Sequence, residues 1–267
     1  MKKLKVCMVS LRSLPLFDES YDSENVIGGA EINLYNLALC FSMSRNIETK
    51  VLVDDFGQPD VYKKGNIELI KFGSASRRGM LGKKAAALAS YIRLFSIDAD
   101  AFIFTTSNAL LGILVLLQRV IKGKKVIFRL SSDLNIDLDN FRKSNGLKNY
   151  LLYKFGIMHA SAVISQTEKQ KNLLWETLGI RSQTIENGFF IRRNTDIKGK
   201  KFILWVGRCM KSKRPMLFVE LARYLPEEEF IMIMPINKEI PPEEFKEREE
   251  LANRIYHSAG QLNNLKI

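Results

Sequence analysis

Short apolar segments alternate with longer segments of helical periodicity over the first two thirds of the chain. Between two of the apolar segments, residues 30–41 carry Leu34, Leu37, Ala38 and Phe41 at the spacing of one helical face. The order strand, helix, strand predicts a parallel sheet with helices on both faces, the doubly wound α/β fold. The predicted strands are residues 4–9, 49–53, 67–71, 101–104, 125–130 and 162–165.

A second alternating pattern follows a polar stretch at residues 192–201. Residues 202–206 and 230–234 predict strands, residues 242–257 predict a helix, and a third strand is expected to begin near residue 264. The helix between the first two strands should have Ser212 as its N-cap. Its predicted apolar face comprises Phe218, Leu221, Ala222 and Leu225.

This change of pattern predicts two domains. We expect an N-terminal Rossmann-like domain over residues 1–195 and a partial C-terminal Rossmann-like domain over residues 196–267. Strand order cannot be deduced from the sequence.

Composition is that of a globular protein, with 46% hydrophobic and 26% charged residues. The net charge of +12 resides mainly in residues 1–195, which hold 28 Lys and Arg against 18 Asp and Glu. Residues 71–84 and 119–129 contain several bases and no acid, a pattern that attracts phosphate groups. No nucleic-acid recognition motif accompanies this charge, so a nucleic-acid partner is not expected.

The three cysteines, at positions 7, 40 and 209, form no close pair that would indicate a zinc or redox site. Neither a zinc knuckle nor a CxxC redox site is therefore expected, and a reducing cytoplasm is favoured. The most apolar run, residues 109–117, is much shorter than the roughly 20 residues that span a bilayer.

A glycine-rich segment, Gly28-Gly29-Ala30-Glu31, opens the first predicted helix. Glycines let a ligand approach the backbone, and the free N–H groups of a helix N-terminus favour an anion. The alternative is a loop whose two glycines only turn the chain. Neither the complete GxGxxG fingerprint nor GxxxxGK[ST] occurs.

Further motifs follow in a recognisable order: Val163-Ile-Ser-Gln-Thr-Glu168, Ile185-Glu-Asn-Gly188, and Ile203-Leu-Trp-Val-Gly-Arg208 with Lys213-Arg-Pro215. Together with the glycine-rich segment they resemble the sixth-strand, hinge and donor-phosphate motifs of the family 4 glycosyltransferases. That family has the two-lobed GT-B fold, and the resemblance spans essentially the whole chain.

The resemblance implies a nucleotide-sugar donor as co-substrate, no cofactor and no metal, with retention of anomeric configuration. It implies that Arg208 and Lys213 hold the donor diphosphate and that Gly28 and Gly29 contact donor phosphate or acceptor. Independently, a strand ending in Gly207-Arg208 places a cation at the carboxyl end of a parallel sheet, where it could stabilise a departing phosphate. The alternative is that Arg208 and Lys213 are ordinary solvated side chains.

The chain also departs from the family. No histidine follows the fifth strand, where many relatives place one near the acceptor. Asp133 or Ser132 is the candidate there to orient an acceptor hydroxyl, although Asp133 could equally be a cap or turn residue. Ala30 and Glu31 are assigned to the acceptor loop. His159 is expected to satisfy the last carbonyls of a helix.

The family's pair of glutamates that grips the donor sugar is expected beyond Ile267, so we expect the donor lobe to be truncated. The leading hypothesis is a cytoplasmic, membrane-peripheral glycosyltransferase acting on a glycan or lipid-linked acceptor. The competing hypothesis is a non-catalytic remnant or partner subunit that binds a glycan or lipid carrier.

Residues 77–96 combine a basic start with Leu81, Leu88, Ile92 and Phe95. Such a segment could lie on an anionic leaflet, or its apolar positions could pack on the sheet. We expect the apolar positions to belong to the core and the basic end to contact an anionic membrane surface.

Overall fold

The structure is a computed structural model that describes residues 2–21, 27–73, 80–190, 201–234 and 242–267. The chain forms two compact units, which are considered separately. The first comprises Met1–Asp22 and Ile27–Phe190, and the second comprises Ser23–Val26 and Ile191–Ile267. The domain boundary expected at residue 195 lies outside the described residues.

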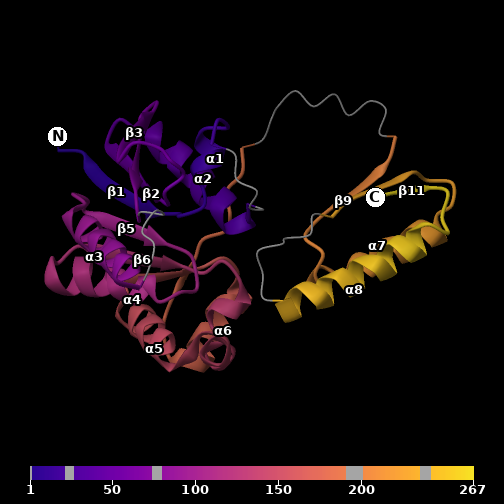
Figure 1. Ribbon diagram of the computed structural model, residues 1–267. Helices are drawn as coiled ribbons and strands as arrows, with labels where there is room; N and C mark the ends of the chain where they lie inside the picture. Colours follow the sequence, from indigo (N-terminus) through magenta and orange to yellow (C-terminus); the bar gives the residue numbers. More distant parts are fainter. Residues whose placement is uncertain (1, 22–26, 74–79, 191–200, 235–241) are drawn as a thin grey trace. The chain divides into compact units, whose positions relative to one another are not determined.

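An eight-stranded sheet in the order β3-β4-β2-β1-β5-β6-β7-β8 forms the centre of the first unit (Figure 1). All neighbouring strands are parallel except β3 and β4. The α/β class and the parallel sheet are thus confirmed, and the short antiparallel edge strand β3 was not predicted. The strands are β1 Leu4–Val9, β2 Ile47–Val53, β3 Val61–Lys64, β4 Ile67–Lys71, β5 Ala101–Phe104, β6 Lys125–Arg129, β7 Ala162–Ser165 and β8 Gln183–Thr184.

Helices lie on both faces of this sheet, each face with its own apolar cluster. On one face α2 packs over β1 and β2, with Leu34 and Ala38 buried as predicted. The second face carries α3, α4, α5 and α6. The helices are α1 Leu14–Phe17, α2 Gly29–Ser42, α3 Met80–Ser96, α4 Leu110–Leu114, the π-helix η1 Val115–Ile121, the 3₁₀-helix η2 Asp133–Asn135, α5 Leu138–His159 and α6 Glu168–Leu178.

Local signals explain where several helices begin and end. The side chain of Asp137 accepts a hydrogen bond from the Asn140 amide (2.9 Å) at the start of α5. Thr167 does the same for α6, which ends at Gly179 with φ of +65°. At the end of α5, His159 Nδ1 lies 3.0 Å from the Phe155 carbonyl oxygen, so the predicted structural role of this histidine is confirmed.

Helices α4 and α5 cross at two glycines. A Cβ atom on Gly112 would lie 2.1 Å from the Leu152 carbonyl oxygen, and one on Gly156 would lie 2.7 Å from the Gly112 nitrogen. Only glycine therefore fits at this crossing. The contact fixes α4, which follows the loop after β5.

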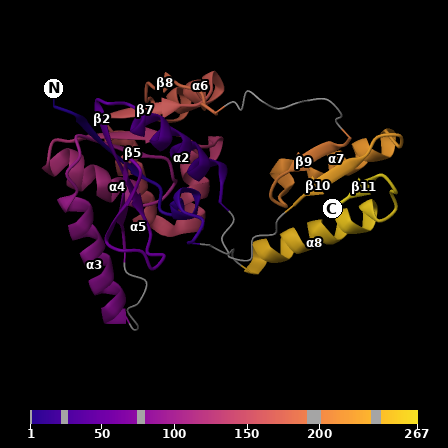
Figure 2. The same ribbon diagram turned by 90° about the horizontal axis from the view of Figure 1, so that it is seen from above.

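Helix α3 differs from its prediction. Leu88 and Ile92 are 60% and 61% exposed, and Phe95 is 39% exposed, so these side chains do not belong to the core. The buried positions are Ser90 and Leu94, which face the sheet on the other side of the helix. Figure 2 shows α3 along the outside of the first unit.

The second unit holds a three-stranded parallel sheet in the order β11-β10-β9. A separate apolar cluster forms its core, including Phe218, Phe230 and Ile255. Its elements are β9 Ile203–Val206, the 3₁₀-helix η3 Lys211–Lys213, α7 Pro215–Tyr224, β10 Phe230–Ile233, α8 Pro242–Ala259 and β11 Leu265–Lys266. The predicted third strand is therefore present, and a Rossmann-like βαβ arrangement is confirmed.

Two details of α7 differ from the sequence prediction. Its N-cap is Arg214, in the left-handed conformation (φ 49°, ψ 48°), because a 3₁₀ turn incorporates Ser212. Val219 is buried with Phe218 and Ala222, whereas Leu221 and Leu225 are 41% and 42% exposed. The helix begins later than predicted, and its buried face is correspondingly rotated.

Candidate functional site

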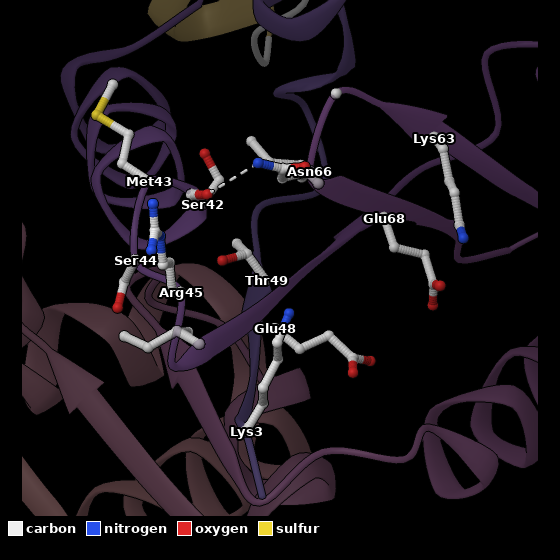
Figure 3. Close-up of a pocket in the computed structure, with 13 residues that line it drawn as sticks. Lys3, Ser42, Met43, Ser44, Arg45, Glu48, Thr49, Lys63, Asn66 and Glu68 are labelled. Carbon is white, nitrogen blue, oxygen red and sulfur yellow. Dashed lines mark hydrogen bonds between the residues drawn. The ribbon is translucent and has the colours of Figure 1, made fainter. Parts of the chain in front are cut away.

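A surface pocket of about 720 Å³ lies at the amino ends of β2 and β4 in the first unit (Figure 3). Two carboxylates of its lining, Glu48 and Glu68, are already compensated, because an oxygen of each lies 3.3 Å from Nζ of the buried Lys50. Asn66 Nδ2 donates to the Ser42 carbonyl (3.3 Å) and closes one side. Parallel α/β sheets bind ligands at the carboxyl ends of their strands, so we place the candidate site at the opposite end.

The loop after β6 is held by one buried amide side chain. Asn135 Oδ1 accepts hydrogen bonds from the Ser131 and Ser132 amides at 2.7 and 2.8 Å. Its Nδ2 donates to Ser107 Oγ in the loop after β5. Tyr153 Oη donates to the Asn135 carbonyl (2.9 Å), and burial raises the pKa of this phenol to about 12. The loops after β5 and β6 are therefore rigidly joined.

These two loops and the first turn of α2 line a cavity of about 310 Å³. Ala30, Glu31 and Ser132, three residues predicted for the acceptor side, all lie in its wall. Asn135, Ser107 and Thr106 add further hydroxyl and amide groups. The lining suits a ligand that both donates and accepts hydrogen bonds.

Gly28 and Gly29 form the start of α2, as N-cap and first helical residue. A Cβ atom on Gly28 would lie 2.7 Å from Glu31 Oε2, so the carboxylate of Glu31 folds back over the helix N-terminus. Gly29 borders open space. The predicted anion site thus has its own carboxylate beside it, and a phosphate there would require Glu31 to turn away.

A neighbouring cavity of about 360 Å³ shares Glu31 and Thr106 with the cavity of about 310 Å³. It lies at the carboxyl ends of β1, β2 and β5 and is lined by Arg12, Asp54 and Asn108. Burial raises the pKa of the Asp54 carboxyl to about 6, an increase that the neighbouring Arg12 partly opposes. Sequence reasoning missed Asp54, although two carboxylates directly after a predicted strand were the available signal.

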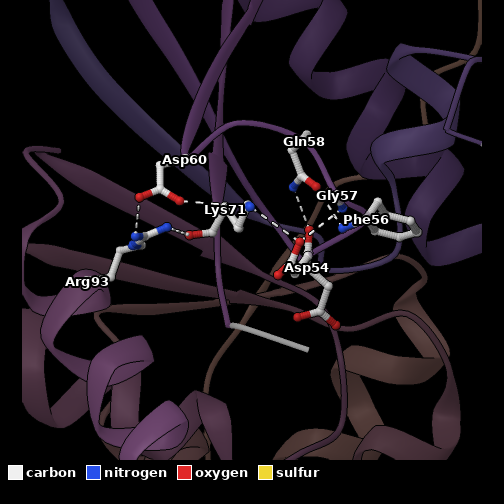
Figure 4. A network of polar contacts seen from close by, with 8 residues as sticks. Asp54, Phe56, Gly57, Gln58, Asp60, Lys71 and Arg93 are labelled. Atoms are coloured by element: carbon white, nitrogen blue, oxygen red, sulfur yellow. Dashed lines mark hydrogen bonds and ion pairs between the residues drawn. The ribbon is translucent and has the colours of Figure 1, made fainter. Parts of the chain in front are cut away.

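A network of polar contacts fixes the loop that carries Asp54 (Figure 4). Gln58 Nε2 donates to the Asp54 carbonyl (2.6 Å), and Gln58 Oε1 accepts from the Phe56 amide (2.7 Å). Farther along, Arg93 of α3 pairs with Asp60 (2.7 Å) and donates to the Lys71 carbonyl (3.0 Å). Asp54 is therefore presented by an ordered loop.

Asp133 lies outside both cavities. Its carboxylate pairs with Lys169 Nζ (2.7 Å) and accepts from Gln170 Nε2 (3.3 Å), both on α6. These contacts lower the pKa of the Asp133 carboxyl. Ser132 lines the cavity, whereas the adjacent Asp133 does not. The role predicted for Asp133, which is to orient an acceptor hydroxyl, stays a prediction.

The segment 185–188 is tied to the carboxyl end of β6. Asn187 Oδ1 accepts from Arg129 Nη2, and Asn187 Nδ2 donates to Gln166 Oε1 (3.1 Å). Gln166 in turn donates to the Leu130 carbonyl (2.5 Å). The asparagine of the predicted hinge motif therefore anchors this segment to the first unit.

In the second unit, Gly207 and Arg208 directly follow β9 at the carboxyl end of the parallel sheet. Gly207 packs against the ring of Trp205, which a Cβ atom would approach to 2.9 Å. Lys211 pairs with Glu247 of α8 (2.6 Å), whereas no carboxylate partner is found for Arg208 or Lys213 among the described residues. Among the described residues, Arg208 and Lys213 are thus uncompensated cations on this loop, as is Arg214 at the start of α7.

The described part of the chain contains no cluster of three or more His, Cys, Asp or Glu side chains that could hold a metal ion. Within the same residues, no helix has the length and apolar character needed to cross a bilayer.

Comparison with solved structures identifies the fold class as GT-B, with its Rossmann-like units. Sucrose-phosphate synthase from Thermosynechococcus elongatus is similar over 99% of this chain and 70% of its own, with a TM-score of 0.66 and 13% identity. At this level of identity the similarity establishes the fold alone.

Two further structures share the fold. The catalytic domain of starch synthase IV from Arabidopsis thaliana, bound to ADP and acarbose, has a TM-score of 0.59 at 9% identity, covering all of this chain and 74% of its own. The UDP-forming α,α-trehalose-phosphate synthase from Burkholderia vietnamiensis has a TM-score of 0.58 at 13% identity, covering 97% and 70%. No protein-family model and no curated protein matches the chain.

Proposed function

We propose that this protein is a family 4 glycosyltransferase that moves a sugar from a nucleotide-sugar donor to a glycan or lipid-linked acceptor. The GT-B fold supports the reaction class, because the solved structures that share it include sugar-transferring synthases. Fold similarity alone does not define a function, so the proposal depends on the site residues.

The observation that carries the proposal is the charge on the loop after β9. Lys211 is neutralised by Glu247, but Arg208 and Lys213 have no carboxylate partner among the described residues. Arginine and lysine held at the carboxyl end of a parallel sheet suit a diphosphate. As the glycosidic bond breaks, negative charge grows on the departing phosphate, and these two cations would stabilise it.

The cavities of the first unit are proposed to hold the acceptor. Their walls bear Ser132, Asn135 and Glu31 in one cavity and Asp54 and Arg12 in the other. Hydroxyl, amide and carboxylate groups of this kind recognise the hydroxyl groups of a sugar. Because Asn135 and Gln58 already fix the loops, these loops lose little conformational freedom when an acceptor binds.

We further propose that transfer proceeds with retention of configuration and without a metal or cofactor. Arg208 and Lys213 would stabilise the negative charge of the departing phosphate, as a divalent ion does in other reactions with a phosphate leaving group. Turnover should accordingly survive a chelator. NMR of the product gives the anomeric configuration, and inversion would contradict this part of the proposal.

The decisive experiment compares Arg208→Ala with Arg223→Ala, a matched change on α7. Donor binding is measured by calorimetry with a panel of nucleotide sugars, and turnover is measured as nucleotide release. We expect Arg208→Ala to lose about a hundredfold or more in turnover, as when one charge-stabilising donor is removed from a preorganised site. Arg223→Ala should match the wild type.

Unchanged turnover in Arg208→Ala would overturn the donor assignment. Donor binding without turnover, across a broad acceptor panel, would instead support a non-catalytic partner subunit. Thermal unfolding of both variants shows whether a loss of activity reflects a loss of fold.

A further inference from the structure

Helix α3 presents an apolar stripe to solvent. Leu88, Tyr91, Ile92 and Phe95 follow the i, i+3, i+4, i+7 spacing of one helix face. They are 60%, 36%, 61% and 39% exposed, respectively. The opposite side of the helix, with Ser90 and Leu94 buried, already packs on the sheet. The four side chains of this stripe therefore do not form part of the core of the first unit.

The neighbouring π-helix η1 extends the apolar surface. Leu116, Val120 and Ile121 are 42%, 58% and 58% exposed. The two helices are joined where Lys122 Nζ donates to the Phe95 carbonyl (2.7 Å) and lies 5.0 Å from the centre of the Phe95 ring. We call the exposed residues of α3 and η1, with the bases beside them, the α3–η1 surface.

Positive charge borders this apolar surface. Lys84, Arg119, Lys122 and Lys125 lie on or beside the two helices, and each lacks an ion pair within the described part of the chain. The acids of the same region are already neutralised by bases. The pairs are Asp60 with Arg93, Asp98 with Lys5, and Asp100 with Lys124.

Exposed aliphatic and aromatic side chains bordered by bases that form no ion pair within the described residues suit a lipid membrane better than a protein partner. Lysine is depleted in protein–protein interfaces, whereas lysine around an apolar helix face is typical of segments that lie in the headgroup region of a bilayer. An anionic leaflet complements both features, since the bases attract its headgroups while the apolar side chains enter its acyl boundary.

We propose that the α3–η1 surface docks the protein on an anionic lipid membrane, with Leu88, Ile92 and Phe95 entering the bilayer. This differs from the sequence expectation, in which only the basic end of the segment contacted the membrane. It does not depend on sugar transfer, so it can fail or succeed separately from the proposed function.

The test is cosedimentation of the full chain with vesicles of phosphatidylcholine alone and of phosphatidylcholine mixed with phosphatidylglycerol. We expect binding to the anionic vesicles, weakened by added salt, and little binding to the neutral ones. The double variant Leu88→Ser/Ile92→Ser should lower the partition coefficient at least about tenfold, because two inserting side chains are lost. Lys84→Gln/Lys125→Gln, which leaves the Lys122 contacts intact, should lower it about tenfold and flatten the salt dependence.

A matched control is available on α5. Leu147 and Leu151 are also spaced i, i+4 and are 54% and 55% exposed, so Leu147→Ser/Leu151→Ser makes the same chemical change elsewhere. The control should retain binding, and circular dichroism should show that both doubles remain folded. An equal loss in the control, absence of binding to anionic vesicles, or equal binding to neutral vesicles would overturn the proposal. So would a Leu88→Ser/Ile92→Ser variant that dissociates a dimer in sedimentation velocity while still binding vesicles.

Discussion

Helices α2 and α3 carry the same apolar spacing but meet different environments. In α2, Leu34 and Ala38 of the i, i+3, i+4, i+7 set are 2% and 0% exposed. In α3, Leu88 and Ile92 at the equivalent steps are 60% and 61% exposed. Helical periodicity therefore shows that a face is apolar but does not show what covers it.

The difference arises because a different face of α3 packs on the sheet. Leu94 is fully buried and Ser90 nearly so on that face, and Ile97, directly after the helix, is also buried. Ser90 Oγ donates to the Ala86 carbonyl (2.8 Å), which lets a polar residue occupy an inward position. The apolar face of α2 packs in the core. In α3 other residues pack in the core, and the apolar face with Leu88 and Ile92 remains exposed.

The largest effect is expected where two helices on the α3 side do pack tightly. Gly112→Ala would place Cβ 2.1 Å from the Leu152 carbonyl oxygen, so α4 and α5 must separate. We expect a loss of about 4 kcal/mol or more in the free energy of unfolding, or failure to fold. Urea unfolding is the measurement. Gly29→Ala, a helical glycine bordering open space, should change stability little, and a small loss in Gly112→Ala would show that the crossing is looser.

Matched serine substitutions test the comparison of α2 and α3 directly. Leu34→Ser removes a buried side chain and should cost about 3 kcal/mol of unfolding free energy. Ile92→Ser should change it by less than about 0.5 kcal/mol, because the side chain is already solvated. Similar urea midpoints for the two variants would mean that the stripe of α3 is covered in solution.

The inward side of α3 also meets a titratable group. A Cβ atom on Gly73 would lie 3.6 Å from Asp54 Oδ1 and 3.9 Å from Ser90 Oγ, which places this carboxyl near the helix. Burial raises the pKa of Asp54 from 3.8 to about 6. The native state therefore keeps this proton at a pH where the unfolded chain has lost it, and this stabilising contribution disappears as pH rises from 3.8 to about 6.

Asp54→Asn removes this pH dependence. Relative to the wild type, the variant should gain about 1 kcal/mol of stability between about pH 4 and pH 7, a value reduced for residual solvent contact. Urea unfolding of both proteins over this range measures the difference. A difference that stays constant with pH would show that the carboxyl is solvated.

A last comparison concerns how helices begin. The N-cap of α2, Gly28, has an extended backbone conformation, whereas the N-cap of α7, Arg214, has a φ of 49°. Arg214 is the single non-glycine residue with positive φ in the described part of the chain. Arg214→Gly should stabilise the second unit by about 1 kcal/mol, because the left-handed conformation costs glycine little. No rise in the thermal midpoint would indicate that the Arg214 side chain compensates the strain.

Most strands could be predicted from the sequence because buried parallel strands are rich in apolar residues, such as Val51–Val53 in β2 and Val126–Phe128 in β6. The edge strand β3, with the sequence Val-Tyr-Lys-Lys, was missed because it is polar and mostly exposed. The start of α7 was misplaced because Ser212 is an ordinary N-cap residue, whereas the chain forms a 3₁₀ turn there and the helix begins only after Arg214.

The candidate site could be predicted only in part. Ala30, Glu31 and Ser132 do line one cavity, because glycine loops and strand ends meet at the same edge of a parallel sheet. Asn135 and Asp54 were missed, since the importance of Asn135 depends on contacts with other loops, such as Ser107 28 residues earlier, and that of Asp54 depends on burial. For Asp133, the sequence could not show that Lys169 and Gln170 engage the carboxylate.

The reversed strand β3 has a consequence for solubility. A sheet edge exposes unpaired amide and carbonyl groups, which invite pairing with another chain and growth into aggregates. Here one edge is a four-residue strand that ends in Lys63 and Lys64, and the other edge, β8, is two residues long. The lysines of β3 and the shortness of β8 make both edge strands poor templates for pairing with another chain. The sheet of the first unit is thereby protected at both edges from pairing with another copy of the chain.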